Sequence, residues 1–285
     1  MRSDVRDYTL TAPASLNAVL SALAANPRLT PIAGGTELMV ALGVGRLGPH
    51  ELISLHRLKE LRFIEEHSGI LTLGAGTTFT DIRRNETIAR EFPLLVQTAA
   101  WTGSIANQNR GTLGGNIANA SPAADSPPAL LVYDATIELV SANGRRTLPY
   151  DEFHLGYKKT VLLPGELIYA IRLPCRFAQH RQYVRKVGTR NAQAISKIAL
   201  AATALMDGVT VREIRLAGAS LVDRPARLHA TEAVLLGKTI TPELRTLAAA
   251  ALASEIKPID DIRSTAKYRI AVACNLLDEF LLSLV

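Results

Sequence analysis

The segment from Thr112 to Asp125, with the sequence TLGGNIANASPAAD, constrains the fold more than any other part of the chain. It combines two adjacent glycines, two asparagines, a serine, a proline and an aspartate, and the apolar run ALLVYDATIELV follows almost directly. A plain connecting loop needs only one or two residues of these kinds. Because glycine lets main chain approach a neighbouring group closely, the segment predicts a place where bare backbone meets a ligand.

Length and composition indicate two domains. The chain has 285 residues, of which 48% are hydrophobic and 5% are aromatic. It can bury one large core or two smaller ones, and we expect two. No apolar run approaches the roughly 18 residues of a membrane span, and the N-terminal sequence MRSDVRDYTLTAPAS has no apolar signal core. We therefore expect a cytoplasmic protein with no membrane span.

The cysteine count and the charge argue against two classes of protein. Cys175 and Cys274 are the only cysteines, which is too few for a disulfide framework, and they lack the spacing of a metal site. The net charge is +6, but the basic residues are scattered among 26 acidic ones, so a nucleic-acid groove has little support. A basic balance fits solubility or an anionic ligand better.

The first part of the chain mixes short helices and strands. Ser15 is placed to cap a helix over 15–26, and Thr36 to cap another that follows the glycine pair Gly34-Gly35. The turn Asn143-Gly144 predicts the tip of a hairpin. We expect strands over 30–33, 51–55, 61–66, 69–76, 135–150 (as the hairpin) and 166–174, and helical periodicity twice over 77–101, interrupted by Pro93.

After Pro174 the pattern changes to strands followed by helices. We expect strands over 183–188 and 211–222, a strand or a helix over 194–206, and helices that begin at about Thr231, Pro242 and Ser264. The predicted fold class is therefore α+β, with one domain over residues 1–175 and a second over 176–285.

Two glycine loops carry the chemical signal. PIAGGTEL and TLGGN each join a glycine pair to a threonine, and the second loop adds Asn116. Consecutive N–H groups in such loops can turn inward and bind an anion, and two loops could hold a pyrophosphate from two sides. A helix that begins directly after Gly35 would add its positive end. The alternative is that each glycine pair only makes a tight turn.

Familiar nucleotide-binding and hydrolase motifs are missing. The chain has no GxxxxGK[ST], and GAGTTF at Gly74 does not match GxGxxG in a strand–helix context. The six histidines do not follow HExxH spacing, and neither Ser104 nor Ser121 lies in GxSxG. A P-loop, a Rossmann site and acyl transfer are therefore not supported.

The chain resembles the FAD-binding (medium) subunit of the xanthine dehydrogenase and carbon monoxide dehydrogenase family of molybdenum hydroxylases. PIAGGTEL resembles the first FAD motif of that family, and TLGGNIANASPAAD the second and more specific one. Similar segments extend through YTLTAPASLNAVLSAL, ELISLHRLKEL, GELIYAIRLP, VRKVGTRNAQAISKI and DIRSTAKYRIAVA. The resemblance implies a two-part FAD-binding domain of the p-cresol methylhydroxylase type and a C-terminal α+β domain peculiar to the family.

The same resemblance implies the residues that bind FAD. The first motif would wrap the diphosphate with Ile32, Ala33, Gly34, Gly35, Thr36, Glu37 and Leu38. Gly111, Thr112, Gly115 and Asn116 would meet it from the other side, and Asn119 lies in the same loop.

Three more residues match family positions further from the diphosphate. Asp125 matches the position that holds the ribityl or adenine-side hydroxyls, and its alternative role is to cap the helix that follows. Ile168 and Lys186 match positions at the flavin ring, where a cation would stabilise reduced, anionic flavin. The alternative for Lys186 is a solvated strand residue.

The resemblance implies an electron-transfer subunit. Electrons from a molybdopterin-binding large subunit would pass through two [2Fe–2S] clusters of a small subunit to FAD, and then to NAD, dioxygen or a quinone. Three such subunits would form a protomer that pairs into a dimer of heterotrimers, and no residue of this chain need be catalytic. Two alternatives stay open, namely a stand-alone FAD-dependent reductase or oxidase and a scaffold that has lost flavin. The intact glycines argue against the scaffold.

Overall fold

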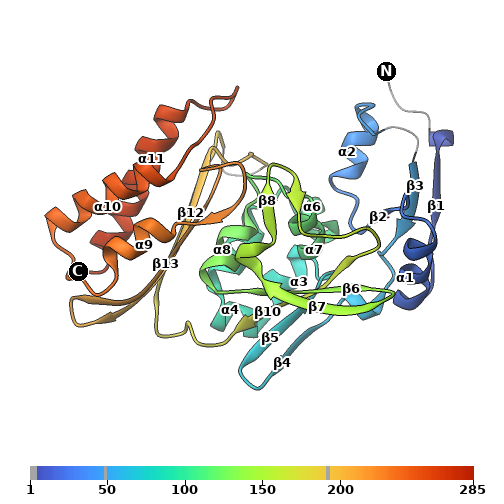
Figure 1. Ribbon diagram of the computed structural model, residues 1–285, viewed down its shortest axis with the longest axis horizontal. Coiled ribbons are helices and arrows are strands. Elements are labelled where there is room, and N and C mark those ends of the chain that lie inside the picture. The colour runs from blue at the N-terminus through green and yellow to red at the C-terminus, as the bar shows by residue number, and fades with distance from the viewer. Residues whose placement is uncertain (1–4, 48–49, 191–192) are drawn as a thin grey trace.

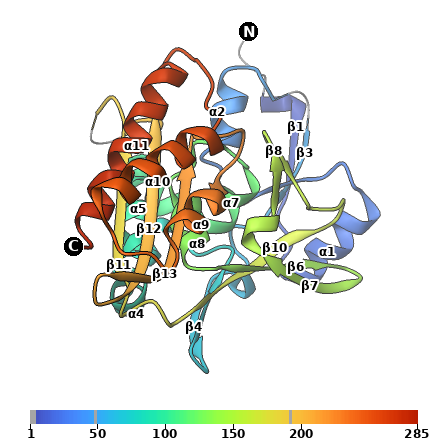
Figure 2. The same ribbon diagram turned by 60° about the vertical axis from the view of Figure 1, so that its left-hand side comes forward.

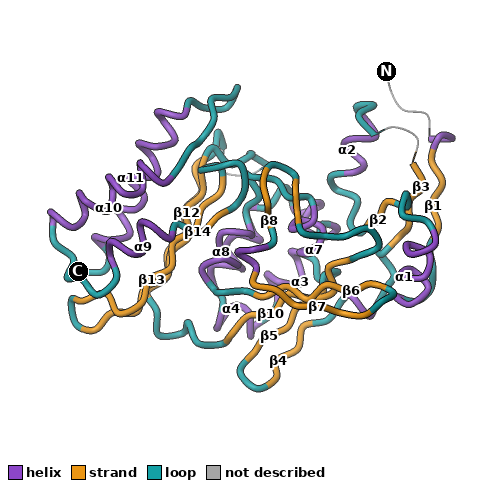
Figure 3. The backbone as a smooth tube through the Cα atoms, viewed as in Figure 1, coloured by secondary structure: helices purple, strands orange, loops and turns teal. Residues whose placement is uncertain are grey.

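The computed structural model describes residues 5–47, 50–190 and 193–285. Helices and strands follow one another in three groups along the chain (Figure 1), and Figure 3 separates them from the loops. The first strands lie at one end of the molecule and the last three helices at the opposite end. Asn191 and Ala192, in the segment VRKVGTRNAQAISKI, lie outside the described residues.

The N-terminal part is a small parallel sheet with two helices. Its strands pair in the order β1-β3-β2, and both pairs are parallel. Helix α1 buries one face of four apolar residues, and the Ser15 hydroxyl accepts a hydrogen bond from the Ala18 N–H, as predicted. The elements are β1 (Tyr8–Thr11), α1 (Leu16–Ala25), β2 (Thr30–Ile32), α2 (Leu38–Gly43) and β3 (His50–Ser54), with short 3₁₀ helices at Val5–Asp7 and Lys59–Leu61.

The predicted capping of the second helix by Thr36 is wrong. Helix α2 begins at Leu38, and Glu37 occupies the N-cap position without a side-chain capping bond. Gly35 has a φ of +76°, so the chain turns there and needs two further residues before it enters the helix. Thr36 is left in the turn before the helix.

The middle part is a five-stranded antiparallel sheet with six helices. The strand order is β4-β5-β10-β6-β7, and the predicted β6–β7 hairpin is confirmed. Its turn lies one residue earlier than predicted, because Ser141 pairs with Gly144 and leaves Ala142 and Asn143 as the two turn residues. The predicted helical stretch divides into three helices, because Asn85 caps the second and Pro93 begins the third. The strands are β4 (Ile64–His67), β5 (Ile70–Gly74), β6 (Thr136–Ser141), β7 (Gly144–Pro149) and β10 (Leu167–Pro174), with a small hairpin of β8 (His154–Gly156) and β9 (Lys159–Thr160). The helices are α3 (Phe79–Arg84), α4 (Glu86–Glu91), α5 (Pro93–Trp101), α6 (Ile105–Arg110), α7 (Leu113–Ala118) and α8 (Ser126–Val132), with a 3₁₀ turn at Tyr150–Glu152.

The C-terminal part is a four-stranded antiparallel sheet between two helical layers (Figures 1 and 2). Helices α9, α10 and α11 cover one face, and α8 of the middle part packs on the other. Residues 194–206, for which the sequence left both a strand and a helix open, contribute to the central strand β12. The elements are β11 (Arg181–Val187), β12 (Ile198–Asp207), β13 (Thr210–Ala219), β14 (Ala226–Arg227), α9 (His229–Leu235), α10 (Pro242–Glu255) and α11 (Ala266–Leu282).

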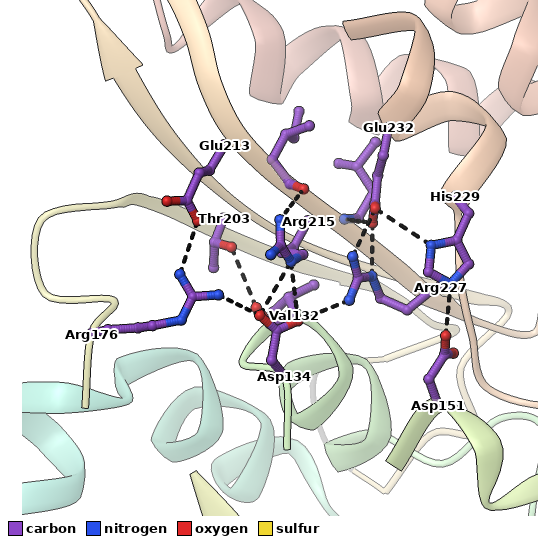
Figure 4. A network of polar contacts seen from close by, with 12 residues as sticks. Val132, Asp134, Asp151, Arg176, Thr203, Glu213, Arg215, Arg227, His229 and Glu232 are labelled. Atoms are coloured by element: carbon purple, nitrogen blue, oxygen red, sulfur yellow. Dashed lines mark hydrogen bonds and ion pairs between the residues drawn. The ribbon is translucent and has the colours of Figure 1, made fainter. Parts of the chain in front are cut away.

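An ionic network joins the middle and C-terminal parts (Figure 4). Asp134, just after α8, lies among the guanidinium groups of Arg176, Arg215 and Arg227. The Nε of Arg215 and the Nη1 of Arg227 each lie 3.0 Å from Asp134 Oδ1. Burial raises the pKa of Asp134, but its hydrogen bond and ion pair with Arg215, and then Arg227 and Arg176, outweigh burial and leave the pKa below its ordinary value. Asp134 is therefore charged at neutral pH.

Candidate functional site

A cavity of about 530 Å³ lies where the N-terminal part meets the middle part. Its size falls in the range of small-molecule and cofactor sites. Both glycine loops line it, one from the end of β2 and one from the start of α7. Residues from 75–79, at the end of β5, and from 162–168, before and within β10, complete the wall.

The first glycine loop lines the cavity and has unpaired backbone donors. Among the described residues, the N–H groups of Gly34, Gly35, Thr36 and Glu37 have no hydrogen-bond partner. Gly34, Gly35 and Thr36 are half-buried, and half-buried backbone N–H groups usually have a partner, so these donors are available to an acceptor in the cavity. Such a row of donors forms a concave site for an anion, and this loop therefore fits a diphosphate.

Gly34 lets the two glycine loops touch. A Cβ atom built on Gly34 would lie 2.0 Å from the carbonyl oxygen of Arg110, two residues before Thr112 of the second loop. A Cβ on Gly114 would lie 2.5 Å from the Cβ of Ala75. Neither position can hold a side chain without moving the backbone, so these glycines serve close packing around the cavity.

The second loop differs from the prediction that its N–H groups turn inward. The N–H groups of Leu113 and Gly114 donate to the carbonyls of Thr77 and Ala75, each at 2.9 Å. Those of Gly115 and Asn116 donate to the hydroxyl and the carbonyl of Thr112. The prediction is wrong here because this loop enters a helix at once and is joined to the end of β5. Its polar contribution to the cavity is the Thr112 hydroxyl and the Asn116 amide.

Three basic side chains that the sequence prediction missed, His56, Arg62 and Arg110, line the cavity. Arg62 is held by Asp81 through two bonds of 3.0 and 2.9 Å. Arg110 Nη1 donates to His56 Nε2 at 3.1 Å, and burial together with the nearby arginines lowers the pKa of His56. His56 is therefore a neutral acceptor, and the two guanidinium groups make this wall favourable for an anion.

One lysine connects the two glycine loops at the rim of the cavity. Lys158, in the turn between β8 and β9, donates to Asn119 Oδ1 at 2.6 Å, and its Nζ lies 3.6 Å from Glu37 Oε1. Its φ of +54° is unusual for a residue with a side chain. The turn thus holds Lys158 in a strained conformation that reaches both loops.

Most of the predicted site residues line the cavity. They are Ala33, Gly34, Gly35, Thr36, Glu37, Leu38, Gly111, Thr112, Gly115, Asn116, Asn119 and Ile168. Ile32 is not in the lining and lies in β2, where its side chain comes within 3.5 Å of the Cβ position of Gly35. It supports the first loop from behind.

Asp125 and Lys186 lie together, outside the cavity lining. Lys186 Nζ is 2.6 Å from Asp125 Oδ2 and also donates to the Trp101 carbonyl, while Ser196 Oγ donates to Asp125 Oδ1 at 2.6 Å. Asp125 makes no capping bond to α8, so that alternative is wrong. The alternative of a solvated Lys186 is also wrong, because only 10% of its side chain is exposed. The predicted contacts of both residues with flavin stay predictions.

A third glycine segment was overlooked. Ala75, Gly76 and Thr78 belong to GAGTTF and line the cavity. The prediction set this segment aside because it does not match GxGxxG. Its signal was a glycine-rich strand end like those of the other two loops, and a Cβ on Gly76 would lie 2.8 Å from the Leu61 carbonyl oxygen.

Comparison with known families identifies the family to which the chain belongs. Residues 6–176 match the model for the FAD binding domain in molybdopterin dehydrogenase, and residues 183–284 match the CO dehydrogenase flavoprotein C-terminal domain. The chain belongs to this family. It is an FAD-binding medium-chain subunit of the carbon monoxide and xanthine dehydrogenase type, and hence an oxidoreductase component.

Individual relatives agree over nearly the whole chain. The medium chain of carbon monoxide dehydrogenase from Hydrogenophaga pseudoflava is 32% identical over 256 residues, which cover 90% of this chain and 88% of that one. The medium chain of glyceraldehyde dehydrogenase from Sulfolobus acidocaldarius is 30% identical, with 92% and 93% covered.

Solved structures show the same fold. Carbon monoxide dehydrogenase from H. pseudoflava superposes with a TM-score of 0.92 at 30% identity, covering 95% of each chain. Quinoline 2-oxidoreductase from Pseudomonas putida 86 superposes with a TM-score of 0.91 at 27% identity, covering 99% of this chain and 98% of that one. The predicted α+β fold is confirmed, while the boundary at residue 175 stays a prediction.

No helix within residues 5–47, 50–190 and 193–285 combines the length and the apolar character that a membrane span needs.

Proposed function

We propose that this medium chain binds FAD in the cavity, with the diphosphate at the first glycine loop, and that it passes electrons from a partner subunit to an external acceptor. The four unpaired N–H groups from Gly34 to Glu37 carry this proposal. Thr112 and Asn116 would face the diphosphate from the opposite wall, and Ile168 would lie toward the flavin ring. Arg62 and Arg110 offset the charge of the phosphates.

Bound FAD supplies the chemistry that links one-electron donors such as iron–sulfur clusters to acceptors of one or two electrons. The chain's own residues bind and orient it. The unpaired N–H groups give the diphosphate donors that cost little reorganisation, because the close contact between Gly34 and Arg110 already fixes the loop. Lys158 lies across the rim and contacts both loops, which favours retention of the bound cofactor.

The electrons would come from a [2Fe–2S] small subunit, which receives them from a molybdopterin-binding large subunit. The relatives named medium chain support a multisubunit assembly. This chain's two cysteines are fewer than the four that an iron–sulfur cluster needs. We further propose that the assembly is a cytoplasmic dimer of heterotrimers.

Two measurements test this function. The purified chain should be yellow, and denaturation should release free FAD into the supernatant, since the site offers a noncovalent diphosphate cradle. Co-expression with genes for the two partners should yield a complex that contains FAD, two [2Fe–2S] clusters and molybdenum in equal proportion for each protomer. Oxidation of a purine or aldehyde by the isolated chain, with flavin as its sole cofactor, would overturn the subunit assignment and favour a stand-alone enzyme.

A further inference from the structure

We propose that Lys158 is a positioning residue that turns the NH₂ end of the Asn119 side-chain amide toward the cofactor cavity. This inference rests on the proposed function, in which the cavity holds FAD. Lys158 Nζ donates to Asn119 Oδ1 at 2.6 Å. Asn119 directly follows α7 and lines the cavity, whereas Lys158 lies outside the lining.

The chemistry of a lysine leaves one orientation of the amide. An ammonium group only donates hydrogen bonds, so it pairs with the oxygen of the amide and not with its NH₂ group. A hydroxyl at this place would accept either end, because it both donates and accepts. With Oδ1 held by Lys158, the NH₂ group is the end left for the cavity, and within the described parts of the chain it has no hydrogen-bond partner.

The unpaired NH₂ group suits the ligand of the proposed function. The phosphate and ring carbonyl oxygens of FAD are acceptors, and a hydrogen bond to a charged acceptor is stronger than one between neutral groups. A reversed amide would direct its oxygen at the same acceptors, and attraction would become repulsion. The orientation of this one side chain therefore affects how tightly FAD binds.

Contacts on both sides hold Lys158 in place. Its Nζ lies 3.6 Å from Glu37 Oε1, so the ammonium group lies between the first glycine loop and Asn119. The β8–β9 hairpin that carries it is anchored by His154, which is buried and packs against the rings of Tyr150 and Phe153. The amide is thus oriented before the ligand arrives, which lowers the cost of ordering it on binding.

A double-mutant cycle separates the orientation of Asn119 from the charge of Lys158. The affinity of the apo chain for FAD is measured by titration in wild type, Lys158→Met, Asn119→Ala and the double variant. Lys158→Met keeps the length of the side chain and removes its donor, so we expect affinity to fall about fivefold. In the Asn119→Ala background the same change should alter affinity by less than about twofold, because Lys158 then has no amide to orient.

Two further variants are the controls. Lys159→Met removes the same charge from the next residue, which is also exposed, and should leave the affinity for FAD unchanged. Lys158→Arg keeps a group that only donates, so it should retain an affinity near that of wild type.

The side-chain NH₂ signals of Asn119 give a readout that a merely structural role would not move. In ¹⁵N NMR spectra, where their absence from Asn119→Ala assigns them, they should shift when FAD binds to wild type and shift much less in Lys158→Met. Equal losses of affinity from Lys158→Met in the two backgrounds would overturn the inference, as would an equal loss from Lys159→Met or unchanged affinity in Lys158→Met. A wild-type chain that binds no FAD would instead overturn the proposed function.

Discussion

Removing Lys186 should expose the cost of burying Asp125. The variant Lys186→Met keeps most of the side-chain volume but removes the ammonium group that lies 2.6 Å from Asp125 Oδ2. Each side chain of the pair is only 10% exposed, so solvent screens the interaction weakly. Breaking a buried ion pair by removing one partner costs about 3–5 kcal/mol.

The structure places the expected loss at the lower end, about 3 kcal/mol. Asp125 keeps its hydrogen bond from Ser196 at 2.6 Å, which continues to stabilise the carboxylate. It can also take up a proton, because burial already raises its pKa above the ordinary value against the opposing effect of Lys186. For a chain of this size, about 3 kcal/mol corresponds to a fall in the melting temperature of roughly 5 °C.

The stability lost in Lys186→Met should depend on pH. A carboxyl whose pKa is raised in the folded state stabilises the fold below the unfolded pKa, and this contribution is lost as the pH rises through the folded pKa. Without Lys186 the pKa of Asp125 rises further, so Lys186→Met should be less destabilised relative to wild type at pH 5 than at pH 8.

Thermal unfolding followed by circular dichroism at both pH values tests this account. The double variant Asp125→Asn with Lys186→Met should recover much of the lost stability, because no unpaired charge remains in the interior. A loss below about 1 kcal/mol for Lys186→Met, in the range of exposed pairs, would refute the reasoning. A larger loss at pH 5 than at pH 8 would refute it as well.

Three further predictions follow from other parts of the structure. Gly34→Ala should abolish FAD binding and destabilise the fold by about 1–3 kcal/mol, because its Cβ would lie 2.0 Å from the Arg110 carbonyl oxygen. FAD titration and thermal melting test this, and Gly43→Ala is the control because a Cβ there would meet nothing within 4 Å. The pKa of Asp134 is lowered in the folded state, so its charge stabilises the fold above the unfolded pKa, and this effect is lost as the pH falls through the folded pKa. Asp134→Asn should therefore flatten the acid limb of a plot of unfolding free energy against pH. Lys158→Ala should speed FAD release several-fold in a stopped-flow displacement assay, and an unchanged rate at low salt would contradict its role at the rim.

Local signals in the sequence predicted the elements that depend on local chemistry. Ser15 caps α1, and the β6–β7 hairpin turns within one residue of the predicted place, because a capping hydroxyl and a two-residue turn act within a few residues. The strand β12 could not be distinguished from a helix. Its first seven residues are all buried, since helices cover both faces of its sheet, and the alternation that marks a half-exposed strand is absent.

The site was predictable where it depends on glycine and unpredictable where it depends on distant partners. The unpaired N–H groups of the first loop follow from its glycine pair, whereas those of the second loop donate to Ala75, Thr77 and Thr112. The pairing of Asp125 with Lys186 joins residues 61 positions apart. Arg62 and Arg110 reach the cavity through tertiary packing, and no periodicity marks such residues.

The middle and C-terminal parts share one hydrophobic core, and this limits how such a chain can change over evolution. Val184, Ala201 and Ala217, from the C-terminal sheet, belong to the same buried cluster as the helices of the middle part. A gene truncated after the first family segment would leave that cluster open to water, so its product should aggregate rather than persist as a smaller flavoprotein. Exchange of C-terminal segments between relatives should succeed only when the apolar face against α8 and the arginines around Asp134 are inherited together.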